Sequence, residues 1–354
     1  MLTVCYITKS ILTFDELIFG KKHPLGKLIL GSEESVKSFE QIDFQKFINQ
    51  NLRTEITKLV LKGSPFNTVS IQEIANQILA KQKSLTKLPT WFQTENIYYP
   101  AKLSIEQTSS EISANYKSKI VSGNSIIDIT GGFGVDCFYF SKQFKKVIHC
   151  EINEELSKIV QHNFKQLKID TIETFAGKGT NFLKETNKFF DCIYIDPSRR
   201  DDVKGKVFLL KDCQPYISPK IDFFFTKAPK ILVKVSPILD ISQTINELKN
   251  VKEIHIISIN NEVKELLFLL EKEYKNAIGI KTINIKKEKI ETFNFTYKED
   301  LFSEYSKPLS YLYEPNAAIL KSGGFHQITN KLAVFKLQQH SHLYTSEKRL
   351  NFPG

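Results

Sequence analysis

The sequence predicts a doubly wound α/β protein, in which helices cover both faces of a mostly parallel sheet. Between about residues 105 and 260, short apolar segments alternate with stretches of helical periodicity. The apolar segments are hydrophobic almost throughout, which is typical of strands buried on both faces. The first of them runs directly into the glycine-rich turn Thr130-Gly-Gly-Phe-Gly134. Such a corner lets backbone approach a ligand closely, at angles that a side chain would forbid.

The strands and helices of this region follow from the spacing of apolar residues and from Gly and Pro breaks. Strands are predicted at 125–129, 146–151, 171–175, 190–195, 230–235 and 253–259. Helices are predicted at 109–116, 154–167, 241–248 and 262–272.

Changes in hydrophobic periodicity along the chain divide it into four parts. Residues 1–38 show no sustained period and form an extension of unassigned role. Residues 39–100 combine a small helical domain with a connector, which is predicted to be extended because prolines bias their predecessors away from helix. The α/β domain covers 101–277, and 278–354 is predicted to be a small α+β domain with strands at 280–285, 290–297 and 332–337 and a helix at 313–321. The chain ends without an obvious closing element, which leaves open that this last domain is incomplete.

Composition indicates a globular protein with a mild preference for polyanions. The 354 residues carry a formal net charge of +10, 41% hydrophobic and 25% charged residues. The five cysteines have no CxxC spacing, so neither a disulfide framework nor a zinc site is expected, and no metal is assigned. No signal peptide or membrane-spanning run is seen, and a cytoplasmic location is expected.

Two acidic residues flank the glycine turn at positions that suit a nucleoside-bearing cofactor. Asp128 ends the first strand, and Glu151 ends the second, twenty residues after Gly131. An acid at the second position can accept hydrogen bonds from both ribose hydroxyls. A dinucleotide site usually has a third glycine, but Cys137 stands there. The pattern therefore favours a cofactor other than NAD, although an ordinary strand–turn–helix corner remains an alternative.

The fourth predicted strand ends in a second acidic motif, Asp196-Pro-Ser-Arg199. Asp196 and the carbonyl of Pro197 can accept the hydrogens of an amine. Arg199 can lie flat on a base or bind phosphate. The alternatives are a strand-terminal turn for Asp196 and a solvated loop for Arg199.

In order along the chain, Asp128-Ile-Thr-Gly-Gly-Phe-Gly-Val-Asp136, Glu151 and Asp196-Pro197 resemble the first, second and fourth motifs of class I S-adenosylmethionine-dependent methyltransferases. The flanking segments Ser104–Glu111, Val233–Asp240 and Tyr313–Ile319 are similar to bacterial methyltransferases that carry a THUMP-like C-terminal domain. The resemblance implies a Rossmann-like, seven-stranded methyltransferase sheet, S-adenosyl-L-methionine as cofactor, and RNA modification with the C-terminal domain holding RNA.

The resemblance also assigns residues. The expected acceptor-side residues are Asp196, Pro197 and Arg199, and the expected cofactor-binding residues are Asp128, Thr130, Gly131, Gly132, Gly134, Asp136, Glu151, Ile152 and Gly177. Two departures limit the analogy. Ser198 replaces the second proline of the base-amine pattern, and Ser236-Pro237 stands where uracil-C5 methyltransferases need a cysteine nucleophile.

These observations together predict a methyltransferase that modifies an exocyclic amine of a base in tRNA or rRNA. The alternatives are methylation of a protein or small molecule, and a catalytically idle RNA-binding module. Trp91, Phe92, Tyr98 and Tyr99 are expected either to pin one domain to another or to stack on unpaired bases. The three histidines without ligand spacing are predicted to be structural: His149, His162 and His255. The sequence indicates no oligomeric state.

Overall fold

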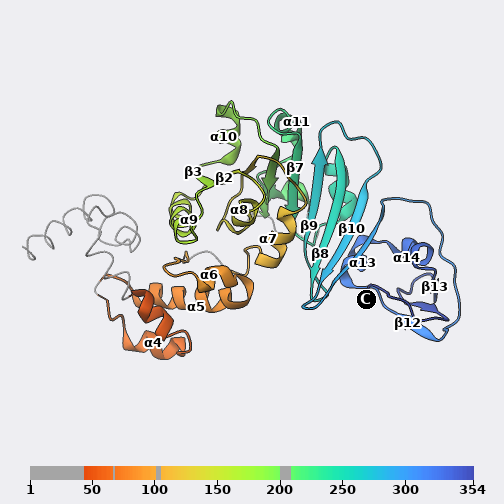
Figure 1. Ribbon diagram of the computed structural model, residues 1–354, viewed down its shortest axis with the longest axis horizontal. Coiled ribbons are helices and arrows are strands. Elements are labelled where there is room, and N and C mark those ends of the chain that lie inside the picture. The colour runs from red at the N-terminus through yellow and green to blue at the C-terminus, as the bar shows by residue number, and fades with distance from the viewer. Residues whose placement is uncertain (1–43, 67, 101–104, 200–208) are drawn as a thin grey trace, which may run out of the picture. The chain divides into compact units, whose positions relative to one another are not determined.

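The computed structural model describes residues 44–66, 68–100, 105–199 and 209–354 (Figure 1). The predicted extension at 1–38 lies outside these residues. The chain divides into two compact units. The first combines the chain up to Ile120 with Gly131–Gly179, and the second combines Val121–Thr130 with Thr180–Gly354.

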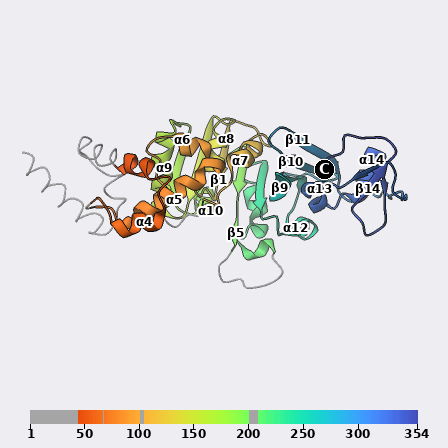
Figure 2. The ribbon, with the colours of Figure 1, turned by 90° about the horizontal axis from the view of Figure 1, so that it is seen from below.

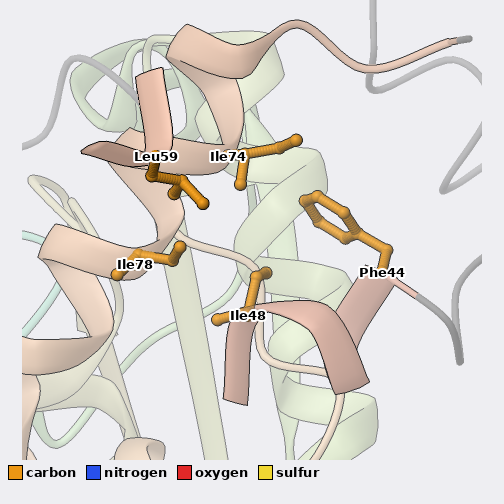
Figure 3. Packing of buried hydrophobic residues seen from close by; sticks show 5 residues of the cluster. All are labelled: Phe44, Ile48, Leu59, Ile74 and Ile78. Atoms are coloured by element: carbon orange, nitrogen blue, oxygen red, sulfur yellow. The ribbon is translucent and has the colours of Figure 1, made fainter. Parts of the chain in front are cut away.

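The first unit begins with the predicted helical domain, which is built around one apolar cluster (Figure 3). Helix α5 is capped by Ser70, whose hydroxyl accepts a hydrogen bond from the Glu73 amide at 3.1 Å. Ile74 and Ile78, four residues apart on α5, share a face and pack with Phe44, Ile48 and Leu59. The helices are residues 44–50, α4 (Ile56–Lys62), α5 (Ile71–Lys87) and α6 (Pro89–Gln93).

The connector after α5 differs from its prediction at one point. Pro89 starts helix α6 because its fixed φ suits the first helical position, so this part is not extended. Residues 97–100 are extended as predicted.

Two side-chain amides clamp the extended part of the connector. The Asn163 amide bonds both the N–H and the C=O of Tyr98, each at 2.9 Å, and Gln77 bonds the same two groups of Tyr99. Tyr98, Tyr99 and Trp91 are buried. These aromatics therefore join the helical domain to the rest of the unit and are not available as a stacking surface for bases.

The rest of the first unit is α/β. Strand β2 pairs in parallel with β3, with Glu151 opposite Ala176. The Glu111 carboxylate, at the start of α7, accepts hydrogen bonds from the Thr90 amide and hydroxyl and from the Tyr139 hydroxyl, all at 2.6 Å. The elements are α7 (Glu111–Ser118), α8 (Val135–Phe140), β2 (Lys146–Glu151), α9 (Glu154–Gln166) and β3 (Ile172–Ala176).

The second unit carries most of the large sheet, which confirms the α/β prediction. Its strands are hydrogen-bonded in the order β11-β10-β8-β9-β7-β4-β1. Pairs β1–β4, β4–β7 and β8–β10 are parallel, whereas β9 is antiparallel to both neighbours and β11 to β10. The strands are β1 (Ser125–Asp128), β4 (Cys192–Ile195), β7 (Lys230–Val235), β8 (Val251–Ile259), β9 (Glu262–Glu271), β10 (Gly279–Ile285) and β11 (Ile290–Thr296).

The predicted helix at 262–272 is wrong, because this segment is strand β9. Asn260 and Asn261 have φ values of 50° and 64°, which is the backbone of a two-residue hairpin turn. The turn folds Glu262–Glu271 back between β7 and β8. Apolar residues such as Leu266 to Leu270 suit a buried strand as well as a helix, and pairing on both edges decides between them.

Strands β10 and β11, which are neighbours (Figure 2), come from the segment predicted to form the C-terminal domain. Strand β10 nevertheless pairs with β8 along its whole length. Two strands of the second unit's sheet thus come from the segment that was predicted to form a separate C-terminal domain. A small sheet in the order β12-β14-β13 follows, formed by β12 (Tyr311–Tyr313), β13 (Phe335–Lys336) and β14 (Tyr344–Ser346).

Two helices complete the C-terminal segment. Helix α13 (Ala317–Ser322) packs on β8, β9 and β10 (Figure 1). It starts later than predicted because Asn316 caps it, accepting a hydrogen bond from the Ile319 amide at 3.2 Å. Helix α14 (Phe325–Leu332) takes up the start of the predicted strand at 332–337.

The remaining elements of the second unit are short. They are α10 (Gly179–Glu185), whose first residue belongs to the first unit, β5 (Ser198–Arg199), β6 (Cys213–Gln214), α11 (Ile221–Phe224) and α12 (Ile241–Glu247). Within the described ranges, no helix has the length and apolar character needed to cross a membrane.

Truncating the helical-domain core should destabilise it. Ile74→Ala leaves a cavity at a fully buried position, and we expect a loss of about 2–4 kcal/mol in the free energy of unfolding. Leu61→Ala removes a side chain that is 83% exposed and should change it by less than about 0.5 kcal/mol. Urea unfolding followed by fluorescence of the single tryptophan, buried Trp91, measures both. Equal effects of the two substitutions would contradict this packing.

Candidate cofactor and acceptor sites

Two amides of the glycine turn donate hydrogen bonds to the end of β2. The Gly131 amide donates to the Cys150 carbonyl at 2.8 Å, and the Gly132 amide donates to Glu151 Oε2 at 2.9 Å. Gly132 and Gly134 have φ values of 52° and 81°, in the left-handed region that favours glycine. The predicted glycines are thus required by the backbone, and the turn is tied to the predicted acid.

Glu151 is held in a fixed orientation. Its Oε1 accepts from the Asn153 amide at 2.8 Å, so each carboxylate oxygen already has one backbone donor. Each oxygen keeps a further acceptor position, which two ribose hydroxyls could use. The next side chain, Ile152, is 63% exposed. The Gly177 amide donates to the Glu151 carbonyl at 2.8 Å, which brings the end of β3 beside these residues.

Asp136, predicted to face the cofactor, is engaged elsewhere. Its Oδ1 lies 2.8 Å from Lys117 Nζ, and its Oδ2 accepts from the Ser109 hydroxyl at 2.8 Å. Lys117 also donates to the Ser109 hydroxyl at 2.7 Å and is fully buried. This closed group joins α7 to α8, and the geometry indicates a structural ion pair.

In the second unit, Thr130 connects two strand ends. Its amide and hydroxyl lie 2.8 and 3.1 Å from Asp128 Oδ1. Its hydroxyl oxygen accepts from the Asp196 amide at 2.7 Å. This bond joins the first residue of the predicted acceptor motif after β4 to Thr130, the first residue of the glycine turn.

The Asp196 side chain has a partner that the sequence analysis missed. Lys234 Nζ lies 2.5 Å from Asp196 Oδ2, and both side chains are only partly buried, at 15% and 33% exposure. Lys234 interrupts the apolar run that follows Lys230 in β7, Lys-Ile-Leu-Val-Lys-Val. A charge inside an apolar run was the available signal. Pro197 is buried, and Arg199 is described by its main chain alone, which pairs with Cys213.

Side chains suited to metal binding do not cluster in the part of the chain that the structure describes. Among the described residues, no group of three His, Cys, Asp or Glu side chains could hold a metal ion. The four described cysteines are buried, and burial raises the pKa of Cys192 to about 12.

Comparison with known families supports a methyltransferase. The model of a family described as RNA cap guanine-N2 methyltransferases matches residues 123–273. A second family model, described as a ferredoxin-like domain, matches 311–353. This second match gives no support to a THUMP-like domain. No curated protein sequence matches the chain significantly.

Among solved structures, a protein from Porphyromonas gingivalis W83, described as a "putative methyltransferase", is similar along most of the chain. It is 29% identical with a TM-score of 0.80, and the match covers 89% of this chain and 80% of that one. TrmK from M. capricolum, solved with S-adenosyl-homocysteine, is 15% identical with a TM-score of 0.34 over 49% of this chain and 70% of that one. A score that low carries no inference.

The assignment of Asp136 to structure can be tested through its partner. Lys117→Met leaves a buried carboxylate without its cation and should lower the free energy of unfolding by about 3–5 kcal/mol. Lys146→Met removes an exposed lysine paired with Glu173 in the same unit and should cost less than about 1 kcal/mol. Denaturant titration of both variants measures these losses. A Lys117→Met protein as stable as wild type would refute a structural role for the Lys117–Asp136 pair.

Proposed function

We propose that the chain is an S-adenosylmethionine-dependent methyltransferase that modifies an exocyclic amine of an RNA base. The observation that carries this proposal is the hydrogen bond from the Asp196 amide to the Thr130 hydroxyl. It ties the acceptor motif to the start of the turn that would hold the methyl donor. The family match over 123–273 and the structural match to the P. gingivalis protein support the same class.

The residues around the turn fit the proposed cofactor. Glu151 would accept the ribose hydroxyls, because its carboxylate is fixed by two amides and keeps acceptor positions. Ile152, exposed beside it, would pack on the adenine face, and Gly177 would let backbone approach the base edge. Asp128 would act through Thr130, since it already bonds the amide and hydroxyl of that residue.

The acceptor residues would mainly position a nucleophile. The bound cofactor supplies a methyl group that is already electrophilic, so alignment and exclusion of water account for most of the rate. Asp196 and the Pro197 carbonyl would accept the two amine hydrogens and turn the nitrogen lone pair outward. Lys234 would hold Asp196 Oδ2, leaving Oδ1 for the amine. The carboxylate would also take the proton that the nitrogen loses after transfer.

RNA is the proposed acceptor because of charge and family likeness. A net charge of +10 favours a polyanionic partner. The family whose model matches is described as methyltransferases that act on guanine N2, an exocyclic amine, of the RNA cap. tRNA or rRNA is the proposed target, and the ferredoxin-like C-terminal segment is the proposed RNA-holding part.

Two measurements test this function together. Calorimetry should detect binding of S-adenosylhomocysteine, and mass spectrometry of total RNA nucleosides should find one methylated base missing from cells that lack the gene. Unchanged nucleosides would remove RNA as acceptor, whereas absence of cofactor binding at millimolar ligand would refute the methyltransferase itself.

Asp196→Ala should abolish methyl transfer, by at least about 100-fold, while cofactor affinity stays within about threefold, because the carboxylate faces the acceptor. Asp222→Ala is the matched control, since it removes an exposed carboxylate that also pairs with a lysine, Lys249 at 2.7 Å. The control should keep full activity. Equal loss of transfer and cofactor affinity in Asp196→Ala would show that its role is misassigned.

A further inference from the structure

A buried histidine lies directly beneath the glycine turn. His149, in the middle of β2, is fully buried, and its Nε2 lies 3.1 Å from the Gly132 carbonyl. A Cβ added to Gly131 would come within 2.3 Å of the imidazole. The ring therefore fills the space that a side chain at position 131 would need. His149 thus excludes a side chain and bonds the turn at the same time.

The protonation state of His149 follows from its surroundings. Burial lowers its pKa to about 4, so the ring is neutral at physiological pH. Because a carbonyl only accepts, the single proton sits on Nε2 and donates to Gly132. Nδ1 then carries a lone pair, and this buried atom has no hydrogen-bond partner among the described residues. The ring therefore makes one hydrogen bond, from Nε2 to the Gly132 carbonyl, while Nδ1 makes none to the described residues.

A second aromatic layer keeps the imidazole in place. Phe164 of α9 meets His149 edge-on, with ring centroids 5.9 Å apart and planes at 86°. A Cβ at Gly134 would come within 2.6 Å of Phe164 and 2.9 Å of Val160. The underside of the turn is therefore packed at both Gly131 and Gly134.

We propose that His149 is a positioning residue for the cofactor site, an inference that rests on the proposed function. The Gly132 carbonyl is held by His149, and the Gly132 amide is held by Glu151. These bonds fix the peptide planes on both sides of Gly132, at the positive φ it adopts. Loss of the first bond frees Gly132 to rotate, and Glu151 loses the donor that orients its carboxylate. His149 thereby sets cofactor affinity without touching the cofactor.

The test compares side chains that reach the Gly132 carbonyl with side chains that do not. His149→Gln places an amide N–H where Nε2 was and should keep the dissociation constant for S-adenosylhomocysteine within about threefold. His149→Asn is too short, and His149→Leu has no donor, so both should weaken binding about tenfold. The KM for S-adenosylmethionine should rise in parallel while kcat changes less than about threefold. If the leucine variant does not fold, the difference in affinity between His149→Asn and His149→Gln still tests whether the bond to the Gly132 carbonyl sets cofactor affinity.

The matched control is His162, which makes the same kind of bond elsewhere in the first unit. Its Nε2 lies 2.8 Å from the Asn96 carbonyl. His162→Leu should leave cofactor affinity unchanged, although it lowers stability. A merely structural role for His149 would give its variants the same behaviour as this control.

A double-mutant cycle with Glu151→Gln tests the route of the effect. If His149 acts through Gly132 on Glu151, the two substitutions are non-additive, and the double variant binds little worse than Glu151→Gln alone. Additive losses, or normal binding by both His149→Asn and His149→Leu, would overturn this inference and leave the proposed function intact. Failure of the wild-type protein to bind the cofactor would instead overturn the proposed function, and this inference with it.

Discussion

The turn between β1 and α8 is the constraint around which the candidate site is organised, because its amides are already committed. The amide of Thr130 donates to Asp128, that of Gly131 to Cys150, that of Gly132 to Glu151, and that of Gly134 to Gly131. Packing against His149 and Phe164 leaves no room for a Cβ at Gly131 or Gly134. Such a turn has one backbone conformation before any ligand arrives. Pre-organisation of this kind lowers the entropy that binding must overcome.

Two lysine–carboxylate pairs differ in burial, and this difference underlies the separate roles proposed for them. Lys117 and Asp136 are shielded from solvent at 0% and 10% side-chain exposure and share the Ser109 hydroxyl. Removing one member would strand a buried charge, which is typical of a structural pair. Lys234 and Asp196 stay partly exposed at the end of two neighbouring parallel strands. A substrate can reach such a pair, and the carboxylate can exchange partners without being desolvated alone.

The C-terminal segment is built onto the sheet of the second unit through polar contacts. Glu291 of β11 is buried. Burial alone would raise its pKa, but hydrogen bonds from Lys286, Lys289 and Asn284 outweigh this and hold the pKa at about 2. The ionised carboxylate also accepts from Asn316, the cap of α13, at 3.3 Å. This bond connects the residue that caps α13 to β11.

The local pattern of the sequence determined the elements whose cause is local. The strands before the glycine turn and the acidic motifs, the helix at 154–167 and the need for glycine at 132 and 134 all follow from short-range spacing and backbone sterics. The segment at 262–272 failed because apolar runs suit a helix or a buried strand equally, and only pairing with β7 and β8 decides.

The partners of each side chain were decided by tertiary structure alone. The sequence suggests that Asp136 is a cofactor ligand, but in the folded chain it pairs with Lys117. The sequence suggests that His149 is an ordinary core histidine, but in the folded chain its ring contacts the glycine turn. Lys234 and Asp196 are 38 residues apart, yet parallel neighbouring strands place them in contact. Spacing along a chain predicts which residues can carry a function. Which of them do so depends on neighbours that are distant in sequence and that only the folded chain brings together.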